Sequence, residues 1–192
     1  MPLLRCAAVL VLLIFSYAVI GKAQNEKPFP TNDEINLLLT QTERAIQQYK
    51  PLIDQEEIQM GQSYKDAAAN DRNVVGALEN FIKNLKTKPQ GFNSPAGFLL
   101  FETLDDADRN ALLCSSGAAL QVPQTDTAAK AFALVHLAQS CQDASALIYT
   151  VSENVGSLYE KYLEAQAQLA GQAVETMQRC IETLKKNGPA KK

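Results

Sequence analysis

The sequence predicts an all-α protein, and three observations lead to that prediction. Apolar residues recur at steps of three and four from residue 35 almost to the end of the chain, which is the period of one face of an α-helix. Proline and glycine gather between these stretches, as they do in the connections between helices. No segment has the pattern of a convincing strand. We therefore expect four to five amphipathic helices in an elongated antiparallel bundle with a long C-terminal helix.

The first 23 residues are predicted to be a signal peptide. Arg5 supplies a positive charge, an apolar run of about 15 residues covers Cys6–Ile20, and Gly21 and Ala23 are the small residues that a signal peptidase reads. This run is shorter than the roughly 20 residues that span a bilayer. We expect cleavage after Ala23 and a secreted or periplasmic location. The alternative is an uncleaved anchor that keeps the run in the membrane.

The remaining chain is predicted to be one domain with short disordered ends. Residues 24–30 are polar, contain two prolines and should form a disordered leader. Residues 31–187 are long enough for a single helical domain with its own core. Residues 188–192 should form a disordered tail.

The first helical stretch covers residues 32–87. Thr31–Glu34 has the pattern of a capping box, and an apolar stripe follows through to Leu85. Pro51 is expected to kink or break the helix. Asn70 or Asp71 would cap a second helix. A kinked pair of helices is more ordinary than one very long helix, which would need supercoiling to keep its stripe aligned.

A loop at residues 88–93 leads into the next helix. Ser94 is its expected cap and Pro95 its first residue. Gly117 is the expected stop. We expect the segment 88–125 to form a shorter helical head.

The segment 127–186 is predicted to be one long helix, or two helices if the chain breaks near Asp143. Its apolar stripe runs from Leu134 to Leu169 without interruption and then shifts. Asn187-Gly188-Pro189 has the composition of a helix stop. This helix should pack antiparallel against the 32–87 stretch.

Three cysteines remain after cleavage, an odd number for an oxidising compartment: Cys114, Cys141 and Cys180. One disulfide is the simplest arrangement, and Cys114–Cys141 is the leading pair. Cys114 should lie roughly 29 Å along its helix from the loop at 88–94 and Cys141 about 22 Å into the next helix, a difference that the loop between them can absorb. Cys141–Cys180 ranks last, since an unbroken helix would hold them about 58 Å apart. The alternative is that all three are small buried apolar residues.

Composition and motifs exclude several classes of function. Without Arg5 and Lys22, the chain keeps 16 basic residues against 21 acidic ones, a net charge of −5 that argues against a nucleic-acid partner. The sequence has no phosphate-binding glycine loop, no nucleophile elbow and no C-x-x-C pair. We therefore predict no enzymatic activity and no cofactor.

Two candidate metal sites are incomplete. His136 has no Cys, Asp or Glu three or four residues away, so it is expected at a solvent edge. Asp106, Asp108 and Asn110 match the first three ligand positions of a calcium loop, but Ala111 replaces the required glycine. We predict no metal site.

A third cluster of acids follows Pro51. Asp54, Glu56 and Glu57 are near enough in sequence for a paired-carboxylate site. Acids on an exposed turn, where they stabilise the start of a helix, are far commoner. We expect these three to be exposed and predict no catalytic residue.

One apolar group has both a structural and a functional interpretation. Phe98, Leu99, Phe101 and Leu104 would line a ligand cavity or a partner surface, or they would simply belong to the most central helix. The expected function is a non-enzymatic interaction or scaffold protein that acts through a helical face. The alternative is a carrier that binds a lipid or another apolar ligand within the bundle. A dimer that forms through the apolar stripe of the long C-terminal helix, or through Cys180, is a further alternative. No transmembrane segment is expected after cleavage.

Overall fold

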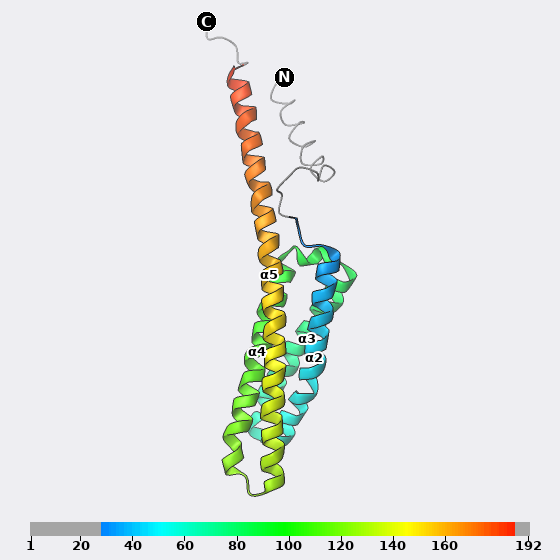
Figure 1. Ribbon diagram of the computed structural model, residues 1–192, viewed down its shortest axis with the longest axis vertical. Coiled ribbons are helices and arrows are strands. Elements are labelled where there is room, and N and C mark those ends of the chain that lie inside the picture. Colours follow the sequence, from blue (N-terminus) through cyan, green and yellow to red (C-terminus); the bar gives the residue numbers. More distant parts are fainter. Residues whose placement is uncertain (1–27, 187–192) are drawn as a thin grey trace. The chain divides into compact units, whose positions relative to one another are not determined.

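The computed structural model describes residues 28–186 of the chain. The predicted signal peptide, most of the predicted leader and the predicted tail lie outside this range. The described residues contain four α-helices joined by 3-10 turns, so the predicted all-α class is confirmed (Figure 1). These helices are α2 (Asn32–Met60), α3 (Lys65–Thr87), α4 (Pro95–Gln121) and α5 (Ala128–Lys186).

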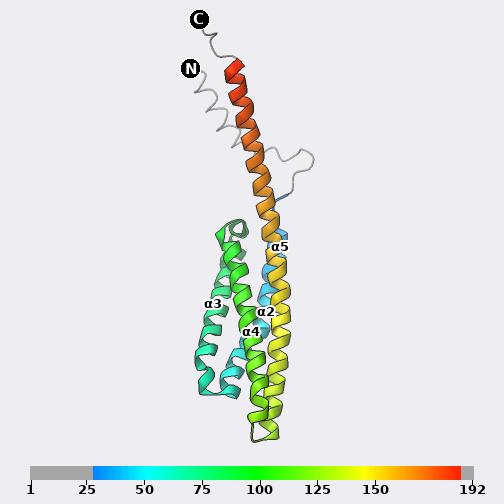
Figure 2. The same ribbon diagram turned by 90° about the vertical axis from the view of Figure 1, so that its left-hand side faces the viewer.

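The contacts divide the chain into two compact units. The larger unit is Pro30–Glu160, and the described residues of the other are 28–29 and 161–186. Within the larger unit, the helices run alternately in opposite directions as an antiparallel bundle, with α5 beside α2 and α4 (Figures 1 and 2). This bundle part of α5 runs antiparallel to α2.

Local signals account for the start of α2 but not for its length. The Thr31 N–H donates to Glu34 Oε2 at 2.7 Å and the Glu34 N–H donates to Thr31 Oγ1 at 3.2 Å, which is the predicted capping box. Of the kink or break predicted at Pro51, the break is wrong, because α2 continues to Met60. Leu52 and Ile53 are buried directly after the proline, and this packing outweighs the lost hydrogen bond.

The chain turns between α2 and α3 at Gly61. Its φ of +80° lies in the left-handed region that favours glycine. The break predicted at Asn70 or Asp71 is wrong, since α3 begins at Lys65 and runs through both residues. Asp71 does not cap a helix because its carboxylate is buried against a tyrosine of α2.

Helix α4 begins as predicted but runs further. The Ser94 hydroxyl accepts the Ala96 N–H at 3.2 Å, and Pro95 is the first helical residue. The helix continues past Gly117 to Gln121, so this segment forms a full bundle helix and not a shorter head. A Cβ on Gly117 would lie 3.1 Å from the Tyr64 ring, which shows that glycine makes room for this side chain.

Helix α5 is continuous from Ala128 to Lys186, so no break forms near Asp143. Two serines in its middle donate hydrogen bonds to acids of α4, each at 2.5 Å: Ser145 to Asp108 and Ser152 to Asp105. These acids therefore connect two helices.

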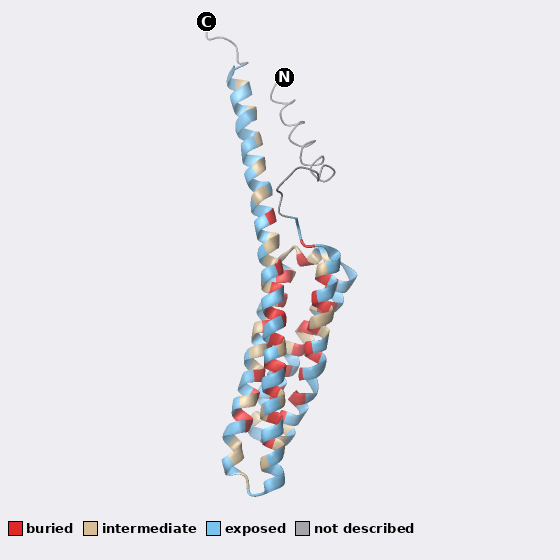
Figure 3. Ribbon diagram, viewed as in Figure 1, coloured by how far each residue is buried: buried red, intermediate tan, exposed pale blue. Residues whose placement is uncertain are grey.

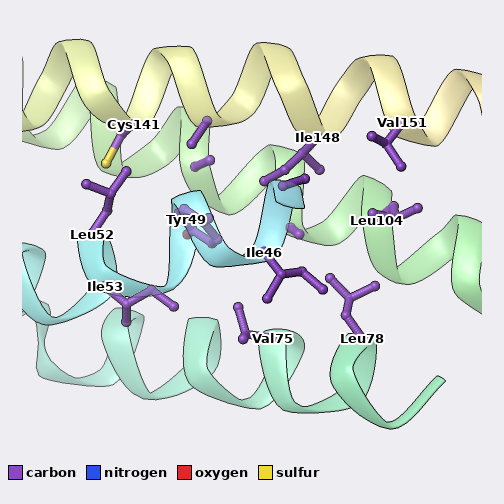
Figure 4. Close-up of a cluster of buried hydrophobic side chains, with 14 of the residues drawn as sticks. Ile46, Tyr49, Leu52, Ile53, Val75, Leu78, Leu104, Cys141, Ile148 and Val151 are labelled. Carbon is purple, nitrogen blue, oxygen red and sulfur yellow. The ribbon is translucent and has the colours of Figure 1, made fainter. Parts of the chain in front are cut away.

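The core of the larger unit lies between all four helices (Figure 3). In Figure 4, Ile46 and Ile53 of α2 point toward Val75 and Leu78 of α3, while Leu52 points toward Cys141 of α5. Burying each large aliphatic side chain contributes about 1.5–3 kcal/mol. None of the described helices has a stretch long and apolar enough to cross a bilayer.

Candidate functional site

An exposed apolar stripe follows the last part of α5. Its members recur at steps of four and three without interruption, and we name them the C-terminal seam: Leu163, Ala167, Ala170, Val174, Met177, Ile181 and Leu184. The first six are exposed and the last is half-buried. The exposed fractions of Leu163, Val174, Met177 and Ile181 lie between 45% and 54%. Figure 3 shows this part of α5 almost entirely exposed or half-buried.

The spacing of the seam is that of a coiled coil. Steps of four and three place its members at the a and d positions of a heptad repeat. The larger a residues, Val174 and Ile181, are β-branched, and Leu163, Met177 and Leu184 are d residues. An a/d stripe of this kind is typical of a helix that packs against another helix.

The seam is not among the sequence predictions. They expect the apolar stripe of the long helix to shift beyond Leu169 and continue along the same helix. The four-three spacing of the seam can be read in the sequence from Leu163 onward. The sequence does not give the burial of each residue, and burial distinguishes a stripe that faces a core from one that faces solvent.

The seam is not the only face of this segment. Ala165 is only 2% exposed. The Tyr162 ring lies 5.9 Å from the ring of Phe29, measured between centroids. At 3.6 residues per turn, Ala165 lies on the opposite side of α5 from most of the seam.

A second candidate is a buried acidic cluster between α2 and α3. The Tyr49 hydroxyl donates to Asp71 Oδ2 at 2.7 Å. Glu56 is 3% exposed, and its Oε2 has no hydrogen-bond partner within the described chain. The expectation that Glu56 is exposed is therefore wrong. Its helix turns it inward, whereas Asp54 stays at the surface.

Burial changes the acidity of this cluster. The pKa of Glu56 is raised to about 8, chiefly by burial and further by the neighbouring Asp71, while Arg72 opposes the shift. Burial also raises the pKa of Asp71, against the hydrogen bond from Tyr49. Burial and Asp71 together raise the pKa of Tyr49 far above its usual range. Glu56 therefore holds a proton at neutral pH.

The acidic cluster does not have the access that catalysis requires. Two carboxyls with separated pKa values are a familiar acid–base arrangement. Here Tyr49, Glu56 and Asp71 are each at most 4% exposed, so a substrate does not reach them in this conformation. Outside the core, Arg72 pairs with Asp54 at 2.9 Å and with Glu57 at 2.7 Å.

The structure divides the predicted apolar group of α4. Phe98 and Leu99 are 44% and 49% exposed, and the Phe98 ring lies 6.0 Å from that of Tyr159. Phe101 is half-buried and contacts the backbone position of Gly156. Leu104 is completely buried in the core. These four side chains do not form one surface.

The predicted cysteine pair is brought together. The Cα atoms of Cys114 and Cys141 lie 6.1 Å apart, within the usual range for a disulfide, and their sulfur atoms are at bonding distance. Both residues are buried, and the pair joins α4 to α5. Cys180 lies half-buried on α5.

The candidate metal ligands stay apart. Asp106, Asp108 and Asn110 lie within α4, which is a helix and not a calcium loop. His136 is exposed on α5, with Nδ1 3.5 Å from the Ser140 hydroxyl. In the part of the chain that the structure describes, no group of three or more His, Cys, Asp or Glu side chains is arranged to hold a metal.

Comparisons with protein-family models, with curated proteins and with solved structures found no match for this chain. Its function is therefore inferred from its own surfaces.

Proposed function

We propose that the chain is an exported, non-enzymatic helical-bundle protein that serves as an interaction or scaffold module of the periplasm or extracellular space. The observation behind this proposal is the C-terminal seam, an apolar heptad stripe left exposed along the last part of α5. Covering half-exposed valine, methionine and isoleucine side chains with a partner removes apolar area from water and so favours association. The proposed partner surface is an α-helix with its own apolar stripe.

Three further features support an exported module. The apolar run and small residues before Gln24 have the pattern of a signal peptide. The Cys114–Cys141 pair suits an oxidising compartment. The acids whose pKa values are raised, Glu56 and Asp71, are buried inside the bundle, which supports the non-enzymatic part of the proposal.

Site-specific cross-linking tests this proposal. A photoreactive amino acid at Ile181 should give a discrete covalent adduct in cells of the source organism, because this side chain projects from the seam. The same amino acid at Thr183 is the matched control, since this residue is exposed on the same turn but off the seam. Equal labelling at the two positions, or none at Ile181, would contradict the proposal.

A further inference from the structure

We infer that the C-terminal seam pairs with the seam of a second copy of this chain, antiparallel, about a twofold axis beside Glu175 and Thr176. This inference rests on the proposed function of the seam as an interaction surface and names its partner. Such a pairing is isologous, because each copy contributes the same residues. Its paired layers lie between residues 167 and 184, and every residue it uses belongs to one of the two compact units.

The volumes of the seam side chains favour the antiparallel orientation. A well-packed helix pair places large residues opposite small ones, so that each layer fills the same space. With the axis beside Glu175, the two outer layers have this property, since Ala167 faces Leu184 and Ala170 faces Ile181 of the other copy, and in the central layer Val174 faces Met177.

A parallel pairing in register lacks this property. It stacks Ala167 on its equivalent and Ala170 on its equivalent, which makes two successive layers without a large side chain. Gaps of this kind forfeit packing contacts. The seam is therefore complementary to itself only when the second helix is reversed.

The charges beside the seam favour the same orientation. Lys185 and Lys186 form the last turn of α5. A parallel pair would bring these lysines of both copies to one end. In the antiparallel register, the lysines of the two copies lie at opposite ends of the paired segment, where their charges do not repel each other.

The length of the seam makes the association reversible. The paired residues span about 26 Å of helix at 1.5 Å per residue. Two of the three distinct layers contain an alanine, so less area is buried than in obligate dimers. The dimer is expected to form and dissociate with protein concentration.

The first experiment measures the mass of the full chain, expressed with its own leader and recovered from the exported fraction. Sedimentation equilibrium should show one copy at low micromolar concentration and two copies, no more, at high micromolar concentration. Met177→Glu should weaken association by about tenfold or more, because each dimer would bury two unpaired carboxylates. Thr183→Glu adds the same charge off the seam and should leave association unchanged.

The second experiment determines orientation. In a Cys180→Ser background, Val174→Cys chains mixed with Met177→Cys chains should form a disulfide-linked dimer on mild oxidation. Val174→Cys chains alone should not, since their thiols are offset by three residues. A linked dimer of Val174→Cys alone would overturn the antiparallel orientation. Absence of any linked dimer would overturn the pairing.

Both experiments separate this inference from the proposed function. Circular dichroism confirms that each variant keeps its helices. If the full chain stays a single copy at all concentrations, the second copy is not the partner, whether the seam is covered by another protein or by the chain's own N-terminal residues. An Ile181-specific adduct with a different protein would then leave the interaction function standing.

Discussion

At the scale of single residues, the buried acids of α2 and α3 have the largest energetic consequences. Glu56 is held beside Asp71 and Tyr49 with little access to water. A carboxyl group in such surroundings favours its neutral form. The proton on Glu56 is therefore part of the folded structure.

This proton predicts how stability depends on pH. The pKa of Glu56 is about 8 in the folded chain against an ordinary 4.5. As pH rises from about 4.5 to about 8, the unfolded chain releases this proton and the folded chain does not, so the free energy of unfolding falls. Asp71 contributes in the same direction. Urea titrations at pH 5 and pH 8 should differ by on the order of a few kcal/mol.

The matched variants are Glu56→Gln and Glu57→Gln. Glu56→Gln removes the titrating group, so its stability should change much less between pH 5 and pH 8. Glu57→Gln alters an acid at the surface ion pair with Arg72 and should keep the wild-type pH dependence. A wild-type stability that rises with pH over this interval would contradict the buried-proton interpretation.

Replacing glycine by alanine should have opposite effects on stability at Gly61 and at Gly76. Gly61→Ala should destabilise the protein by about 1 kcal/mol, because alanine disfavours the φ of +80°. Gly76 lies inside α3 with open space where a Cβ would stand. Gly76→Ala should stabilise by about 0.5–1 kcal/mol through the lower entropy of the unfolded chain. Thermal unfolding should show a lower melting temperature for Gly61→Ala and a higher one for Gly76→Ala. A change in the same direction for both variants would contradict the turn at Gly61.

At the scale of elements, α4 and α5 are joined in three places. Asp105 and Asp108 accept hydrogen bonds from serines of α5, and the Cys114–Cys141 pair lies further along the same two helices. Together these contacts fix the register of one helix against the other.

The cysteine pair should contribute measurably to stability. It closes a loop with a sequence separation of 27. Replacing both cysteines by serine should lower the free energy of unfolding by about 2–4 kcal/mol, through the freedom that the unfolded chain regains. Mass mapping without reduction should show Cys114 linked to Cys141. A reducing agent that leaves the wild-type stability unchanged would show that the bond does not form.

At the scale of the whole molecule, the two units predict a tolerated truncation. The core cluster lies within Pro30–Glu160, which is one compact unit. A chain that ends at Glu160 should therefore keep a cooperative unfolding transition, with a stability within about 1 kcal/mol of the full chain. It should also lose the concentration-dependent association, because it lacks the seam. Loss of the cooperative transition would show that the bundle depends on residues 161–192.

The sequence by itself determined the helical class, the caps at Thr31 and Ser94, and the cysteine pair that the structure brings to bonding distance. These features depend on neighbours within a few residues, or on the length of helices between two loops. Gly61 is itself a local signal for the turn between α2 and α3, but Asn70 and Asp71 are competing signals for the start of the second helix.

Only the tertiary structure decided which polar residues are buried and which apolar residues stay exposed. Asp71 has the local signal of a helix cap, yet its carboxylate accepts a hydrogen bond from the hydroxyl of Tyr49, 22 residues away. Asp105 and Asp108 of α4 accept hydrogen bonds from two serines of α5. A periodic apolar stripe is identical in sequence whether a core covers it or not. Burial depends on contacts between distant segments, so the seam between Leu163 and Leu184 becomes visible as a surface only in the folded chain.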